Sequence, residues 1–90
     1  MTDWTAVPEA PAIRALASLP PKAAWAVTEF ITGPLERNPY RATKFLDEPF
    51  EGIRSGNVGV YRVLVRIIDE ENIVRIMRVE HRSTVYSRPL

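Results

Sequence analysis

The chain has 90 residues, of which 46% are hydrophobic and 26% charged, and its formal net charge is +1. This length suits one domain, over residues 1–90, and the apolar content is too high for a wholly disordered chain. Because no apolar stretch approaches the roughly 20 residues of a membrane span, and no basic-then-apolar secretory signal begins the chain, we expect a cytoplasmic protein without membrane contact.

Cysteine is absent and His81 is the single histidine. This composition excludes a disulfide framework, a thiol nucleophile and a thiolate metal site, and one histidine argues against zinc. We therefore expect no metal and no cofactor. Beyond Asn72 the basic residues are all arginines, opposed only by Glu80. Because guanidinium forks match phosphate oxygens bidentately, this end of the chain suits a polyanion or an acidic protein partner, although a solvated basic face gives the same pattern.

The first half of the chain reads as a short strand followed by two helices. Trp4 to Val7 suggests the strand, and Glu9 to Leu19 is rich in the good helix formers Ala, Leu and Arg. Ile13 shares one face of this helix with two leucines at three-residue steps. Pro20-Pro21 ends the first helix and starts the second, so the two helices form an antiparallel hairpin.

The second helix is predicted over Ala23 to Arg37. Gly33-Pro34 interrupts it, which predicts either a kink or a helix end followed by one extra turn. Trp25 lies off the core-facing stripe, and we favour a position at the edge of the core over an exposed interface anchor. The stripe itself comprises Val27, Phe30, Ile31 and Leu35.

Residues 38–56 are predicted to be irregular, with prolines and glycines throughout. Phe45 and Phe50 are expected to pin this segment to the core. A connection of this length is often functional or carries a short strand.

A β-hairpin is predicted next, from Tyr61 to Asp69 and from Ile73 to Val79, because both runs are β-branched and apolar. A three-residue loop ending at Asn72 suits this hairpin, since Asn tolerates the left-handed conformation. The resulting register opposes Asp69 to Ile73, Val65 to Met77, Val63 to Val79 and Glu80 to Arg62. The apolar side chains then share one face, and Arg62 and Arg78 project from the other, away from the helices.

The segment after the hairpin gathers polar groups that could cleave RNA. His81 can move a proton, an arginine such as Arg82 can stabilise a charged phosphate, and Tyr86 can stack on a base or donate a proton. In such a reaction the 2′-hydroxyl attacks the adjacent phosphorus without a metal. A structural interpretation, with His81 capping the strand and Tyr86 packing on the sheet, stays open from the residues alone.

These residues resemble the RelE/ParE superfamily of type II toxins over nearly the whole chain. The sharpest part is Tyr61-Arg62 at the strand start together with His81-Arg82 and Tyr86 after the hairpin. The resemblance implies an α+β fold made of an N-terminal strand, a helical hairpin and an antiparallel β-sheet. The wider match comprises Gly59-Val60-Tyr61-Arg62-Val63-Leu64, Ile68-Asp69-Glu70-Glu71 and Gly52-Ile53-Arg54.

The resemblance also implies a ribosome-dependent endoribonuclease that cuts mRNA, arrests translation and is held inactive by a cognate antitoxin in a hetero-oligomer. It assigns Arg62 to the scissile phosphate and Tyr86 to stacking or protonation at the cleavage site. The set we predict as catalytic is Arg62, His81, Arg82 and Tyr86, and the set we predict to bind RNA is Lys44, Arg54 and Arg78.

Glu80 departs from the family pattern, in which glycine or a basic residue is expected. Opposite Arg62, its carboxylate lowers the positive field at the phosphate. A ParE-like inhibitor of DNA gyrase that cuts no RNA is therefore an alternative, and a degenerate member that only binds its antitoxin is another.

Overall fold

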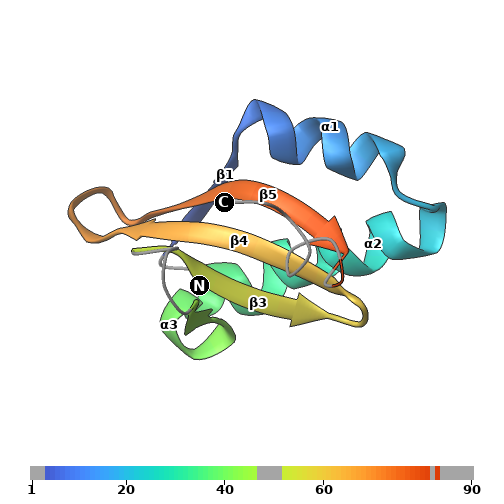
Figure 1. The fold of residues 1–90 in the computed structure, drawn as a ribbon. Helices are drawn as coiled ribbons and strands as arrows, with labels where there is room; N and C mark the ends of the chain where they lie inside the picture. Colours follow the sequence, from blue (N-terminus) through green and yellow to red (C-terminus); the bar gives the residue numbers. More distant parts are fainter. Residues whose placement is uncertain (1–3, 47–51, 82, 84–90) are drawn as a thin grey trace.

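The computed structural model describes residues 4–46, 52–81 and 83, which form helices packed on one face of a five-stranded mixed sheet (Figure 1). The strand order is β1-β5-β4-β3-β2. The edge strand β1 is parallel to β5 and the remaining pairs are antiparallel, so the α+β prediction is confirmed. The strands are β1 (Thr5–Pro8), β2 (Lys44–Phe45), β3 (Arg54–Val58), β4 (Tyr61–Ile68) and β5 (Ile73–His81).

Prolines set where the helices start. Proline lacks an N–H but has a helical φ, so it is tolerated in the first turn, where Pro21 and Pro39 lie. Within the described residues, none of the helices is long and apolar enough to cross a bilayer. The elements are α1 (Ala10–Ser18), α2 (Pro21–Phe30), the π-helical η1 (Ile31–Leu35), α3 (Pro39–Ala42) and the 3-10 turn η2 (Asp69–Glu71).

The Gly33-Pro34 interruption takes the form of the wider turn η1. Pro34 cannot donate to the carbonyl four residues earlier, and a π-helical turn redistributes the remaining hydrogen bonds without ending the helix. The chain then continues to Asn38, whose N–H donates to the Pro34 carbonyl at 3.0 Å.

The core lies between the helices and the sheet. Val27 is fully buried, and Ile31 and Leu35 follow it on the predicted stripe. From the sheet come Val63, Val65, Val74, Ile76 and Val79, and from α1 comes Ala12. Burial of these side chains supplies the main favourable contribution to folding.

Two predictions about side-chain burial on the helices are wrong. Ile13 is 53% exposed, because α1 packs on β5 through the small side chain of Ala12, which turns the apolar stripe by one residue. Trp25 is 68% exposed rather than at the edge of the core.

The hairpin register is correct at one end and wrong at the other. Val63 opposes Val79 and Arg62 opposes Glu80, as predicted. Near the turn, however, Val65 opposes Ile76 rather than Met77, and Ile73 opposes Ile68 rather than Asp69. A register shift between Leu64 and Val65 absorbs the difference, as a β-bulge does by placing one extra residue in one strand. The turn is η2 closed by Asn72, which has the predicted left-handed conformation at φ 54°.

The segment predicted as irregular is more ordered than expected, since it contributes α3, β2 and β3. The Asn38 side chain caps α3 by accepting the Arg41 N–H. Gly56 on β3 lies under Phe30, where a Cβ atom would come within 2.4 Å of the ring. Glycine therefore lets β3 and the end of α2 approach closely. Phe50 lies outside the described residues, and Phe45 is 69% exposed rather than pinned to the core.

Candidate functional site

Arg62, Arg78 and Glu80 share the sheet face that points away from the helices. Alternation along the strands places them there, because the neighbouring Val63 and Val79 point into the core. Arg62 lies between Asn57 of β3 and Glu80 of β5. Its side chain is half-buried and its Nε atom is buried. The two neighbouring strands therefore fix the backbone position of Arg62 in the middle of the sheet.

A carboxylate is built into this positive face. The Glu80 side chain is 9% exposed and accepts a hydrogen bond from Nη1 of Arg78 at 3.2 Å. The Arg78 side chain is 48% exposed. Leu64 opposes Arg78 and is buried. The three charged groups together carry one net positive charge.

His81 points to the other face of the sheet. It follows Glu80 by one residue and opposes Tyr61, with the two rings edge-to-face and 5.6 Å between their centroids. Its Nδ1 atom lies 2.9 Å from the Ser83 hydroxyl. The fold brings Arg62 and Arg78 together as predicted, but it places His81 at the end of β5 behind them. Arg82 and Tyr86 lie outside the described residues.

Arg54 is bound to the chain itself. Its Nε donates to the Thr43 hydroxyl at 2.8 Å, and Nη2 donates to the carbonyls of Thr43 and Tyr40 at 2.9 and 3.1 Å. The guanidinium also lies over the rings of Tyr40 and Phe45. These contacts join α3 and β2 to the sheet, and an RNA contact by Arg54 stays a prediction beside them. Lys44 is exposed on the edge strand β2.

Comparison with known proteins identifies the family. A family profile described as ParE toxin of type II toxin-antitoxin system, parDE, matches residues 12–86. Toxin RelG of Mycobacterium tuberculosis is 46% identical over 75 residues, covering 83% of this chain and 86% of that protein. The chain belongs to the RelE/ParE family of type II toxins.

Two further relatives support this membership. Toxin RelE of the same organism is 43% identical to this toxin, over 86% of the chain and 79% of that protein. The crystal structure of the toxin–antitoxin complex RelBE2 from Mycobacterium tuberculosis contains a chain with a TM-score of 0.83 and 42% identity. The match covers 89% of the toxin and 99% of that chain.

A hydrogen bond joins α3 to the hairpin turn of the toxin. The Tyr40 hydroxyl donates to the Asp69 carboxylate, and the Tyr40 ring meets Trp4 edge-to-face at 6.0 Å. The hydrogen bond to Asp69 raises the pKa of Tyr40 above its ordinary value of 10.0, with desolvation and the Asp69 charge adding to it. No sequence pattern indicated this contact, because its partners are 29 residues apart, Tyr40 in a segment expected to be irregular and Asp69 at the end of a predicted strand.

No metal centre is evident in the part of the toxin that the structure describes, where no three His, Cys, Asp or Glu side chains cluster.

A pair of arginines beside α3 was not predicted from the sequence. Arg37 and Arg41 line a pocket beside α3, and the signal that could have identified them is their four-residue spacing around Asn38-Pro39.

Proposed function

We propose that the toxin is a ribosome-dependent mRNA endoribonuclease that binds RNA across the sheet face carrying Arg62. The observation that carries this proposal is that Arg62 and Arg78 lie on neighbouring strands and share the sheet face that points away from the helices. Guanidinium groups on a strand can hold a phosphate in a fixed orientation. The identity to toxins RelG and RelE adds support, since it extends over most of the chain.

In the proposed reaction the RNA supplies its own nucleophile. The 2′-oxygen bonds to the adjacent phosphorus and the bond to the 5′-oxygen breaks, leaving a 2′,3′-cyclic phosphate and a 5′-hydroxyl. A base takes the proton of the 2′-hydroxyl, and an acid protonates the departing 5′-oxygen. Because the nucleophile is internal to the RNA, the step needs no metal-bound water.

Arg62 has the electrostatic role in this reaction, because negative charge builds up on the phosphate oxygens as the 2′-oxygen attacks. Arg78 adds a second cation, and Glu80 lowers the field of both. Arg82 and Tyr86 are proposed for proton transfer and base stacking by their match to the family motif. His81 also matches that motif, but it lies on the other face of the sheet at the end of β5, so no step at the Arg62 site is assigned to it. Lys44 is proposed to contact the RNA backbone from the sheet edge.

We also propose a cognate antitoxin as the partner of the toxin, in a hetero-oligomer that blocks its activity. The solved relative at 42% identity is a toxin–antitoxin complex. The exposed aromatic Trp25 on α2 is the kind of side chain that anchors such an interface.

A gyrase inhibitor without ribonuclease activity is the second candidate. Two observations favour it: the profile that matches the chain describes a ParE toxin, and Glu80 places a carboxylate opposite Arg62. In that case the sheet face would not bind RNA, and toxicity would result from inhibition of DNA gyrase.

The deciding experiment induces the toxin in cells and follows protein synthesis, mRNA 5′ ends and plasmid supercoiling together. We expect rapid loss of translation with mRNA cut at codon boundaries. Intact mRNA with an SOS response and altered supercoiling would replace this proposal with the gyrase candidate.

Arg62→Lys tests the site because it keeps the charge but loses the guanidinium fork. We expect cleavage to fall about 100-fold, the order seen when one stabilising donor is removed from an active site. Arg66→Lys is the matched control, since Arg66 lies on the same strand and face and is exposed. Full toxicity of Arg62→Lys, with the fold checked by circular dichroism, would contradict the assignment.

A further inference from the structure

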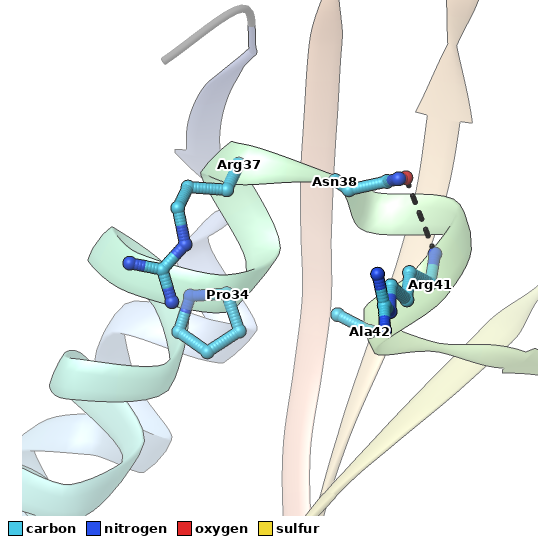
Figure 2. Close-up of a pocket in the computed structure, with 5 residues that line it drawn as sticks. All are labelled: Pro34, Arg37, Asn38, Arg41 and Ala42. Atoms are coloured by element: carbon cyan, nitrogen blue, oxygen red, sulfur yellow. Dashed lines mark hydrogen bonds between the residues drawn. The ribbon is translucent and has the colours of Figure 1, made fainter. Parts of the chain in front are cut away.

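A basic pocket lies on the opposite side of the toxin from Arg62. It has a volume of about 410 Å³ and is lined by Pro34, Arg37, Asn38, Arg41 and Ala42 (Figure 2). Arg37 extends back along the helix to lie beside Pro34, and Arg41 stands across the gap on α3. The pocket therefore lies between η1 and α3, in the helical layer.

The described residues do not neutralise the two guanidinium groups of this pocket. Both side chains are exposed, and none of the described residues that line the pocket is acidic. Across the described ranges 4–46 and 52–81, neither guanidinium has an ion pair or a side-chain hydrogen bond. By contrast, Arg54, Arg75 and Arg78 all have such partners. Two like charges facing one concave space create a local positive potential that an anion would relieve.

The local backbone fixes this arrangement. Asn38 accepts the Arg41 N–H through Oδ1 and donates its own N–H to the Pro34 carbonyl. The cap therefore ties the start of α3 to the end of η1. Arg37 lies between these two elements. Pro34 and Pro39 further restrict the backbone on both sides. The two arginines are presented from constrained turns, which lowers the entropy lost when they bind a ligand.

We propose that the Arg37–Arg41 pocket binds a phosphate of the RNA backbone, as a second contact separate from the site around Arg62. This inference rests on the proposed function for its choice of RNA. Arginine forks match phosphate oxygens bidentately, and Asn38 adds a side chain of the kind that also contacts phosphates. Among the described residues that line the pocket none is aromatic, which disfavours the core of a protein interface.

The position of the pocket sets its role. Arg62 lies on the sheet face that points away from the helices, whereas the pocket lies between η1 and α3, so the two are separate contacts in this proposal. Lys44 follows α3 along the chain and begins β2, the edge strand of the sheet. The pocket is therefore a docking contact that adds affinity to RNA binding without taking part in bond cleavage.

The test measures binding of the purified toxin to a short single-stranded RNA by fluorescence anisotropy. The RNA carries 2′-O-methyl groups, which remove the nucleophile and prevent cleavage. For the double variant Arg37→Gln with Arg41→Gln we expect affinity to fall about tenfold at low salt. The slope of log affinity against log salt should fall by about 0.7 for each phosphate that the variant no longer binds.

A matched control removes the same net charge elsewhere on the helices. Arg14→Gln with Lys22→Gln changes two exposed cations on α1 and α2. We expect this variant to bind the RNA with nearly the wild-type affinity. Equal losses in both variants would overturn the proposal, because they would indicate a general field effect. Unchanged RNA affinity in the pocket variant would also overturn it.

A protein ligand is distinguished by a second titration. If the pocket variant keeps its RNA affinity but binds the cognate antitoxin more weakly, the pocket receives carboxylates and the proposal is wrong. Failure of the proposed function has a separate signature. A toxin that leaves mRNA intact in cells, yet binds the 2′-O-methyl RNA through Arg37 and Arg41, would refute the ribonuclease and retain the pocket.

Discussion

Arg62 and Glu80 oppose each other directly across the β4–β5 ladder, on the sheet face that points away from the helices. Glu80 also accepts a hydrogen bond from Arg78, so one carboxylate faces both arginines of the proposed phosphate site. Its low exposure of 9% limits screening by water. The carboxylate therefore orders the arginines and, at the same time, reduces their attraction for RNA.

Glu80→Gln removes this opposing charge while keeping the shape of the side chain. We expect affinity for a 2′-O-methyl RNA to rise about threefold at low salt, because the site gains one net positive charge. Anisotropy titrations at several salt concentrations measure the effect, with Glu71→Gln in the exposed hairpin turn as the control. A loss of affinity would mean that ordering of Arg78 outweighs the change in field.

The hairpin shows how far sequence reasoning extends. The left-handed Asn72 and the pairing of Arg62 with Glu80 were predictable, because turn chemistry and alternation determine them. The bulge was not. Apolar residues occupy both odd and even positions between Ile73 and Met77, so either register would bury apolar side chains near the turn. Packing of Ile76 against the helices decides it.

Contacts between distant segments also escaped prediction at the site. The position of Arg62 follows from its own strand, whereas the contacts of Arg54 depend on Thr43 and Tyr40, which were expected to lie in an irregular segment. The Arg37–Arg41 pocket likewise exists only once η1 and α3 have formed. No periodic pattern in a single sequence indicates such contacts between distant segments.

Gly56→Ala tests the close approach of β3 to α2. The new Cβ would lie 2.4 Å from the Phe30 ring and 3.2 Å from the Ala42 carbonyl oxygen. We expect the free energy of unfolding to fall by about 1–3 kcal/mol, as for overpacked cores. Urea denaturation measures it. Gly33→Ala is the control, because its Cβ would meet only Arg37 at 3.9 Å and should be neutral or stabilising.

Adding Phe30→Leu to Gly56→Ala tests whether the Phe30 ring causes the loss of stability. If the clash with the ring is responsible, the double variant should be more stable than the sum of the two single changes predicts. Additive losses would point to the Ala42 backbone instead.

Arg54→Lys separates a structural role from an RNA contact. Lysine keeps the charge but cannot reproduce the hydrogen bonds from Nε and Nη2 to Thr43 and Tyr40. We expect the free energy of unfolding to fall by about 1–2 kcal/mol, with little change in RNA affinity. Thermal unfolding and anisotropy measure the two effects, and Arg14→Lys at an exposed position of α1 is the control. Unchanged stability with weaker RNA binding would support the RNA contact.

The hydrogen bond from Tyr40 to Asp69 predicts a loss of stability at alkaline pH. Folding raises the pKa of Tyr40, so the folded state favours the protonated phenol. The contribution is fully present below the ordinary pKa of 10.0 and is lost as pH rises through the higher folded value. Tyr40→Phe should therefore be less stable than wild type at neutral pH, and the difference should shrink above pH 10. Urea unfolding of both proteins across this range measures the trend, and a constant difference would show that the phenol proton makes no contribution.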